Sequence, residues 1–385
     1  MKITPGLDLR ERCRCKLACI DSGTCDFERD VGLTGLALAR VGRMVRNGLE
    51  PAWVRFDRER ALAAASLRTG QRLRRGLVWT ALCWTIGGVV GMPSAPAATL
   101  AVGDASFRCT QLQRTGDEVV TLETTLAGVP AILRVPRQVT RPPIVLWHGF
   151  GAPASGRALM DAMPLDDVPA VKVYLGLPLF GTRAPADGNK ELGRRQTTDF
   201  AMLLFKPAVV GAADELPAVV AALGQHGCMT SDQRIELFGF SAGGTAALVA
   251  LMRGKVAVSA AVLLNASTGL NASVDAWQRA LGQPYAWTPA ARALAEETDA
   301  IAHAADIARG KTPPAILIIQ GDSDTVLTTA PATALQQALL PLYRRDHHET
   351  RLGLVVVPGM PHGWTDDKAA AAEVRGEAAA WFARH

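Results

Sequence analysis

Short apolar runs rich in β-branched residues recur along the chain from residue 119 to residue 357. Runs of about four to eight residues are typical of strands, and most of these are apolar at successive positions. Strands that are apolar on both faces indicate a parallel sheet covered by helices on both sides. The predicted strands are Val119–Leu126, Ala131–Val135, Pro143–Trp147, Val171–Leu177, Ile235–Phe240, Ala260–Asn265, Ala315–Gln320 and Leu352–Val357.

Segments rich in Ala and Leu, each long enough for a helix, alternate with the strands from the fourth strand onward. A turn at Gly128 joins the first two strands closely and predicts an antiparallel start. We predict an α/β fold with a mostly parallel eight-stranded sheet, helices on both faces and one domain over residues 98–385. In such a sheet, chemistry belongs at the carboxyl ends of the strands. The predicted helices are Thr198–Leu223, Ala242–Met252, Pro289–Ala308, Pro331–Leu340 and Asp367–Ala383.

The distribution of charge argues against a nucleic-acid partner. The 385 residues include 41 Lys and Arg against 36 Asp and Glu, a net charge of +5. Residues 1–97 hold 16 of the basic and 9 of the acidic side chains, which leaves 25 basic and 27 acidic ones in the predicted domain. The domain therefore lacks the basic excess that binding to a phosphate backbone requires.

A targeting segment explains the excess of basic side chains in residues 1–97. A basic stretch at residues 72–75 is followed by the uncharged apolar stretch Gly76–Val90 and by the small-residue site Ala95-Pro96-Ala97. This order is that of a secretory signal. We predict a signal peptide over residues 71–97 and an exported, periplasmic or secreted, mature protein without a membrane span. The alternative is a membrane anchor formed by residues 76–92.

Residues 1–70 resemble no known module, and we interpret them as a disordered extension or an over-extended reading frame. Their four cysteines, Cys13, Cys15, Cys19 and Cys25, do not have the spacing of a metal site. The predicted mature chain keeps Cys109 and Cys228. In an oxidising compartment these two could form a disulfide, and two unreactive thiols are the alternative.

Ser241 is the candidate nucleophile. The segment "LFGFSAGGTA" passes from an apolar strand through a turn of small residues into an Ala-rich helix. Such a turn projects the serine hydroxyl next to a helix N-terminus. A packed glycine turn with an incidental serine is the alternative.

A serine nucleophile needs two N–H donors for the oxyanion of a tetrahedral intermediate. We assign one to the backbone of Phe150, in "HGFG" after the third strand, and the other to Ala242, which follows the nucleophile. His148 ends a strand before the serine, and we expect it to brace this loop.

The acid and the base follow later strands. Asp324 stands in "GDSDTV", with Asp322 as its competitor, and His362 stands in "PHGW" after the last strand. His347 and His348 precede that strand, at the wrong edge of the sheet. Ser241, Asp324 and His362 thus appear in the order nucleophile, acid, base, each at the end of its own strand.

These four motifs resemble those of the α/β-hydrolase superfamily in type and order, over about residues 118–385. The chain is most similar to dienelactone-hydrolase-like and prolyl-oligopeptidase-like domains. The resemblance implies the catalytic triad Ser241, Asp324 and His362, and the oxyanion donors Phe150 and Ala242. Dienelactone hydrolases usually have cysteine at the position of Ser241, so their substrate is not carried over.

We expect a serine carboxylesterase acting on a small-molecule ester, with no metal or organic cofactor. A peptidase or amidase of the prolyl-oligopeptidase-like type and a non-catalytic binding protein with this fold are the alternatives. Phe180, Phe240 and Trp364 are expected to line the substrate site, although Phe180 could belong to the core. Residues 267–312 offer room for a small cap. Trp277, Tyr285 and Trp287 either line a pocket in this cap or are buried between two helices with a structural role only.

Overall fold

A computed structural model describes residues 99–101, 107–114, 118–230, 234–345 and 347–385. The predicted extension (residues 1–70), the predicted signal or anchor (residues 71–97) and the four cysteines between Cys13 and Cys25 lie outside the described residues. Within the described part, one sheet runs in the strand order β1-β2-β3-β5-β4-β6-β7-β8-β9.

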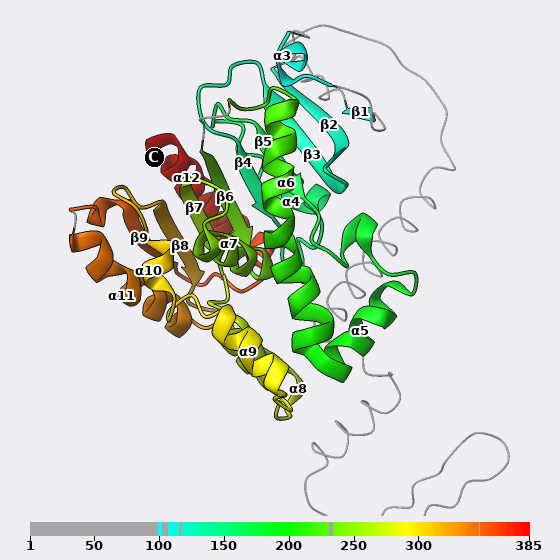
Figure 1. Cartoon of the computed structure of the whole chain (residues 1–385), viewed down its shortest axis with the longest axis vertical. Coiled ribbons are helices and arrows are strands. Elements are labelled where there is room, and N and C mark those ends of the chain that lie inside the picture. Colours follow the sequence, from blue (N-terminus) through cyan, green and yellow to red (C-terminus); the bar gives the residue numbers. More distant parts are fainter. Residues whose placement is uncertain (1–98, 102–106, 115–117, 231–233, 346) are drawn as a thin grey trace, which may run out of the picture. The chain divides into compact units, whose positions relative to one another are not determined.

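The sheet is mostly parallel, as predicted (Figure 1). β3 pairs antiparallel with β2 and β5, and every other neighbouring pair is parallel. The eight predicted strands are all present, and the short β1 adds a ninth at the edge beside β2. The strands are β1 (Thr99–Ala101), β2 (Val119–Leu126), β3 (Val129–Pro136), β4 (Ile144–Trp147), β5 (Lys172–Leu175), β6 (Ile235–Phe240), β7 (Val258–Leu264), β8 (Ala315–Gly321) and β9 (Leu352–Val357).

The central strands are buried on both faces, because alternate side chains enter two separate apolar cores. One face of the sheet packs against α4 and α12, and the other against η2, α6, α7, α10 and α11. The helices are α3 (Cys109–Leu112), α4 (Gly156–Ala162), α5 (Gly188–Asp199), α6 (Gly211–Gln225), α7 (Ala242–Arg253), α8 (Leu270–Leu281), α9 (Pro289–Glu297), α10 (Ala304–Ile307), α11 (Thr329–Arg345) and α12 (Lys368–Arg384); shorter or wider turns are η1 (Gly181–Arg183), η2 (Phe200–Val210), η3 (Glu349–Arg351) and η4 (Trp364–Asp366).

The longest helical stretch joins α5, η2 and α6 over Gly188–Gln225. η2 is π-helical and contains Pro207, whose missing N–H is tolerated in such a widened turn. The 38 residues are apolar enough to cross a membrane by length and composition, and half of the most apolar window is buried within the domain. We interpret the stretch as a core helix of the α/β fold.

The two cysteines of the predicted mature chain are joined. Cys109 at the start of α3 and Cys228 after α6 form a disulfide with a Cα–Cα distance of 5.0 Å across 119 residues of sequence. Beside it, the rings of Phe107 and His226 stack with centroids 4.0 Å apart. The disulfide therefore ties the segment that precedes β2 to the end of α6.

Candidate active site

Ser241 occupies a strained turn between β6 and α7. Its φ of 52° and ψ of −118° are uncommon for a residue with a side chain, and such strain persists only where the surroundings impose it. The backbone N–H of Ser241 donates to the carbonyl oxygen of Leu264 in β7, 2.9 Å away. The turn thus presents the hydroxyl at the carboxyl edge of the sheet, in the strand–turn–helix setting of a nucleophile elbow.

Close backbone packing imposes this turn. A Cβ on Gly243 would meet the carbonyl oxygens of Trp147 and His148, so only glycine lets α7 approach the end of β4 this closely. Ala242 is the first residue of α7, and the N–H of a first helical residue has no acceptor inside its helix. Its position at the start of α7 is consistent with the predicted role of this N–H as an oxyanion donor.

The loop after β4 lies directly against the elbow. A Cβ on Gly149 would come within 3.0 Å of the Ser241 Cβ and 2.9 Å of the Phe240 ring. The next residue, Phe150, is half-buried, and its ring stacks on that of Phe180 with centroids 5.1 Å apart. The loop that carries Phe150 therefore packs directly against Ser241, and Ala242 follows Ser241 in the chain, so the two residues remain the predicted oxyanion donors.

His148 braces this loop and does not reach Ser241. Its Nδ1–H donates to the carbonyl oxygen of Gly149 at 2.7 Å, and its Nε2 accepts from the backbone N–H of Leu177 at 3.0 Å. Burial lowers the pKa of His148 to about 4, so the ring is neutral at physiological pH. Nδ1 therefore fixes the loop after β4, and Nε2 joins this loop to the segment after β5.

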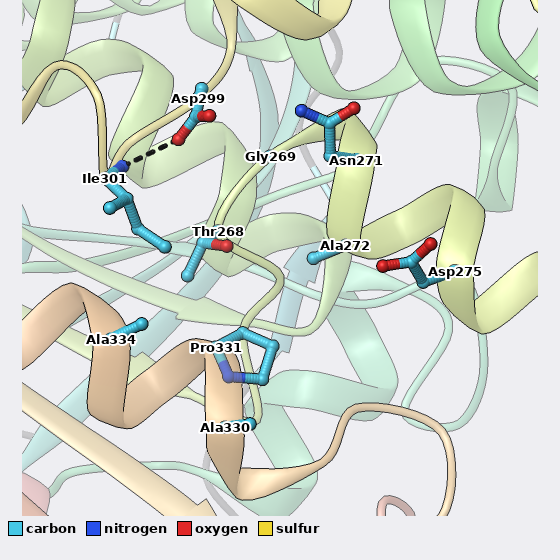
Figure 2. A pocket seen from close by; sticks show the side chains of 10 residues that line it. All are labelled: Thr268, Gly269, Asn271, Ala272, Asp275, Asp299, Ile301, Ala330, Pro331 and Ala334. Atoms are coloured by element: carbon cyan, nitrogen blue, oxygen red, sulfur yellow. Dashed lines mark hydrogen bonds between the residues drawn. The ribbon is translucent and has the colours of Figure 1, made fainter.

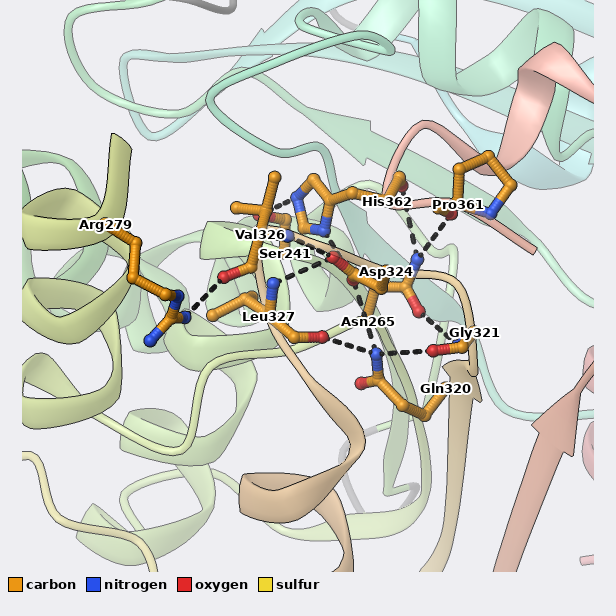
Figure 3. A network of polar contacts seen from close by, with 10 residues as sticks. All are labelled: Ser241, Asn265, Arg279, Gln320, Gly321, Asp324, Val326, Leu327, Pro361 and His362. Carbon is orange, nitrogen blue, oxygen red and sulfur yellow. Dashed lines mark hydrogen bonds and ion pairs between the residues drawn. The ribbon is translucent and has the colours of Figure 1, made fainter. Parts of the chain in front are cut away.

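Three side chains from three strand ends form a continuous hydrogen-bond chain (Figure 3). The Oγ of Ser241 lies 3.0 Å from Nε2 of His362, and Nδ1 of His362 lies 2.7 Å from Oδ2 of Asp324. The Asp324 side chain is fully buried, and its Oδ1 accepts from the backbone N–H groups of Val326 and Leu327, each at 2.8 Å. The geometry suits general-base activation of the serine by His362.

The rival acid and the rival bases have other partners. Asp322 accepts hydrogen bonds from the backbone N–H of Gly359 at 2.7 Å and from the hydroxyl of Ser323 at 3.0 Å, and so closes a turn. His348 lies before β9, where its Nε2 contacts the carbonyl oxygen of Lys311 at 2.9 Å. His347 adjoins it, in the left-handed region at a φ of 58°.

Two amide side chains that the sequence analysis passed over belong to the same network. Gln320 Nε2 donates to the carbonyl oxygen of Leu327 at 2.7 Å and lies 3.3 Å from Oδ2 of Asp324. Asn265 bonds the backbone on both sides of the site. Each is a polar residue at the carboxyl end of a mostly apolar strand, Asn265 directly after β7 and Gln320 one position before the end of β8. This pattern is the signal by which they could have been found.

The expected aromatic walls need correction. Phe240 and Trp364 are fully buried, with ring centroids 6.4 Å apart, and the ring centroid of Phe240 lies 5.3 Å from that of His362. Phe240 is buried because its side chain, one position before Ser241, enters the core on the α12 face. Phe180 is also buried, under Phe150, as the core alternative anticipated. These three rings therefore belong to the core, whereas Phe150 keeps partial exposure.

The segment between β7 and β8 packs as helices against the domain. Trp277 Nε1 donates to the carbonyl oxygen of Gln196 at 2.9 Å, and the Tyr285 hydroxyl donates to Oδ1 of Asp199 at 2.6 Å. Both aromatic side chains are buried, and the half-buried Trp287 contacts Tyr285 edge to face. These contacts match the structural helix pair that was the alternative to a pocket-lining cap.

A separate cavity of about 320 Å³ opens between the first turns of α8 and α11 (Figure 2). Its lining is mainly apolar, and its polar side chains are those of Thr268, Asn271, Asp275 and Asp299. Its lining does not include a member of the hydrogen-bond chain at Ser241. The lining residues are Thr268, Gly269, Asn271, Ala272, Asp275, Asp299, Ile301, Ala330, Pro331 and Ala334.

The part of the chain that carries the candidate site is similar to a known protein family. Residues 209–385, which carry Ser241, Asp324 and His362, match the model of the prolyl oligopeptidase family. No curated protein matches the chain by sequence. The family match agrees with the order of motifs and strands, and the α/β-hydrolase resemblance is confirmed.

Solved structures of similar fold include esterases and peptidases. A Thermus thermophilus protein has 17% identity and a TM-score of 0.49, covering 69% of this chain and 99% of its own. Carboxyl esterase 2 of Tuber melanosporum has 16% identity and a TM-score of 0.46, covering 76% and 90%. A puromycin-hydrolysing peptidase of Mycobacterium tuberculosis has 17% identity and a TM-score of 0.45, covering 69% and 39%. Likeness at this level does not transfer a substrate.

Proposed function

We propose that this member of the α/β-hydrolase superfamily is an exported serine carboxylesterase, with Ser241 as nucleophile, His362 as base and Asp324 as acid. The observation that carries the proposal is the chain of short contacts from Ser241 Oγ through the His362 ring to Asp324, at 3.0 and 2.7 Å. The strained backbone at Ser241 supports it, because such conformations cluster at active sites.

The proposed reaction has two steps. Ser241 Oγ attacks the ester carbonyl carbon while its proton passes to Nε2 of His362, and Asp324 stabilises the imidazolium through Nδ1–H. The N–H groups of Phe150 and Ala242 stabilise the oxyanion, and the imidazolium then protonates the leaving alcohol. In the second step His362 takes a proton from water, the hydroxide attacks the acyl-enzyme, and Ser241 recovers its proton as the acid leaves.

A small or extended ester is the favoured substrate class. The Ser241 residue is about 9% exposed and the His362 side chain 17% exposed, so the reacting atoms lie near the surface of the described domain. The helices between β7 and β8 pack against α5 and η2 through Trp277 and Tyr285. A site whose histidine is partly accessible at 17% exposure is suited to small substrates and to the exposed ends of longer ones.

A peptidase or amidase is the second candidate, because the matched family is the prolyl oligopeptidase family. The same triad cleaves amides when the leaving amine is protonated by the histidine. A panel of p-nitrophenyl esters and aminoacyl p-nitroanilides, assayed on the purified protein, separates the two. Hydrolysis of the anilides without hydrolysis of the esters would favour the peptidase.

Covalent labelling tests whether the site is catalytic at all. A fluorophosphonate probe should label the wild type at one residue, Ser241, and should not label Ser241→Ala or His362→Ala. Removing either residue should lower kcat by about 10⁶-fold if the triad acts as a unit. An unlabelled wild type that folds normally would instead support a non-catalytic binding protein.

Export is supported by the disulfide between Cys109 and Cys228, since such bonds persist in oxidising compartments. The predicted signal over residues 71–97 would deliver the domain there. N-terminal sequencing of the protein from its natural source tests this part. A mature N-terminus near residue 98 supports cleavage and export, and a retained segment 76–92 in the membrane fraction supports the anchor.

A further inference from the structure

Asn265 is a fully buried polar residue directly after β7, next to the proposed triad (Figure 3). Its backbone N–H donates to the carbonyl oxygen of Ile319 in β8 at 2.9 Å. Its φ of 43° lies in the left-handed region, which asparagine adopts more readily than other residues with side chains. The backbone therefore holds this amide in one place at the carboxyl edge of the sheet.

The side chain uses both its donors and its acceptor. Nδ2 donates to the carbonyl oxygens of Pro361 and His362, each at 3.2 Å, and Oδ1 accepts from the backbone N–H of Gly321 at 2.9 Å. A primary amide has two N–H donors and one carbonyl acceptor, so all three bonds need an amide. A carboxylate would keep the acceptor and lose both donors.

The three bonds join the two loops that carry the acid and the base. Gly321 ends β8, three residues before Asp324, and Pro361 and His362 belong to the loop after β9. Asp322 joins the same loops through the N–H of Gly359, but this second link is exposed, where a hydrogen bond contributes less. Asn265 is therefore a buried link between the two loops, in addition to the hydrogen bond between His362 and Asp324 themselves.

We propose that Asn265 is a positioning residue for His362 and Asp324, an inference that rests on the proposed function. Its side-chain amide contacts backbone atoms of both loops and no reacting atom. Rates in such sites depend steeply on alignment, and a displacement of about 1 Å lowers them about 100-fold. The amide therefore acts on the transition state through the His362 ring, with little effect on substrate binding.

The first experiment compares Asn265→Ala with Tyr343→Phe. Tyr343 is a matched control, because its buried hydroxyl donates to the carbonyl oxygen of Pro314 at 2.6 Å, before the opposite end of β8. Both variants lose buried hydrogen bonds, but only Asn265→Ala removes bonds to the two loops that carry Asp324 and His362. With p-nitrophenyl butyrate we expect kcat of Asn265→Ala to fall about 10–100-fold, with KM changed less than about threefold. Tyr343→Phe should keep kcat within about twofold.

A second variant keeps the test decisive if Asn265→Ala does not fold. Asn265→Asp is nearly isosteric and retains the acceptor for Gly321, while its second oxygen faces the carbonyl oxygens of Pro361 and His362. When protonated, this carboxyl donates one hydrogen bond, and when ionised it repels both carbonyls. The ratio of variant to wild-type kcat should therefore fall as pH rises, which a merely structural role does not require.

The outcomes distinguish the inference from the proposed function. If the wild type neither hydrolyses esters or amides nor labels with the fluorophosphonate, the proposed function fails. If the wild type is active and a folded Asn265→Ala loses no more kcat than Tyr343→Phe, the positioning role is overturned. A pH-independent ratio for Asn265→Asp, with kcat near that of the wild type, overturns it as well.

Discussion

Nδ1 of His362 lies 2.7 Å from Oδ2 of Asp324, whereas Asp322, two positions earlier, bonds the backbone N–H of Gly359. The two aspartates stand in one loop after β8, yet only Asp324 is directed into the site. Its Oδ1 is held by the N–H groups of Val326 and Leu327, so Oδ2 is left to face the histidine.

This difference predicts the effects of two matched substitutions. Asp324→Asn should lower kcat about 10⁴-fold, because the amide no longer holds the imidazole in the tautomer that accepts the serine proton. Asp322→Asn should change kcat less than about threefold. Steady-state hydrolysis of a p-nitrophenyl ester measures kcat of both variants. A larger loss of kcat in Asp322→Asn than in Asp324→Asn would identify Asp322 as the acid instead.

The elbow should not tolerate a methyl group at Gly243. A Cβ there would meet the carbonyl oxygens of Trp147 and His148, which belong to backbone that cannot yield easily. Gly243→Ala should lower the free energy of unfolding by about 1–3 kcal/mol and kcat by at least about 100-fold. Urea unfolding and ester hydrolysis measure the two effects.

Gly376 is the control for that substitution. It lies exposed inside α12, and a Cβ there meets nothing within 4 Å. Gly376→Ala should raise the free energy of unfolding by about 0.5–1 kcal/mol, because alanine favours the helix, and should leave kcat unchanged. An equal fall in the free energy of unfolding in Gly243→Ala and Gly376→Ala would show that close packing at Gly243 does not account for the effect.

Glu236 should make stability fall between acid and neutral pH. Its side chain is fully buried in β6, 3.5 Å from Arg141, and its Oε2 has no hydrogen-bond partner among the described residues. Burial raises its pKa from 4.5 to about 7, with Arg141 opposing the rise. The folded protein therefore keeps a proton that the unfolded chain has lost, and this stabilisation disappears as pH rises through about 7.

Glu236→Gln tests this linkage. The neutral amide should remove the fall in the free energy of unfolding between about pH 4.5 and 7, a difference on the order of 2–3 kcal/mol from this one group. The exposed Glu373→Gln in α12 is the control and should leave the pH dependence as it is in the wild type. Parallel stability curves for the wild type and Glu236→Gln would contradict the assignment.

The disulfide should contribute to stability and not to catalysis. Cys109 and Cys228 close a long loop, and removing such a bond costs about 2–5 kcal/mol. The double variant Cys109→Ser, Cys228→Ser should unfold about 5–10 °C lower in calorimetry, with kcat within about twofold of the wild type. An unfolding temperature that neither the double variant nor a reductant changes would show that the bond is not formed in the protein.

The sequence by itself determined the strand segments and the order of the chemistry along them. Apolar β-branched runs and Ala/Leu-rich segments are local patterns, and all eight predicted strands are present. The glycines around Ser241 likewise mark a tight turn without any knowledge of distant residues. The helices were less uniformly determined. The bounds of α7 and α12 lie within one residue of their predicted ranges, whereas α4 was not predicted and α11 extends to both sides of its predicted range.

Only the tertiary structure decided how side chains are directed at the ends of those strands. Ser241 and His362 are 121 residues apart, and the direction of each loop side chain depends on contacts of that separation. The burial of Phe240 and Trp364, the pairing of Cys109 with Cys228 and the bonds of Asn265 likewise depend on segments that meet only when the sheet has formed. A local pattern carries no information about such partners.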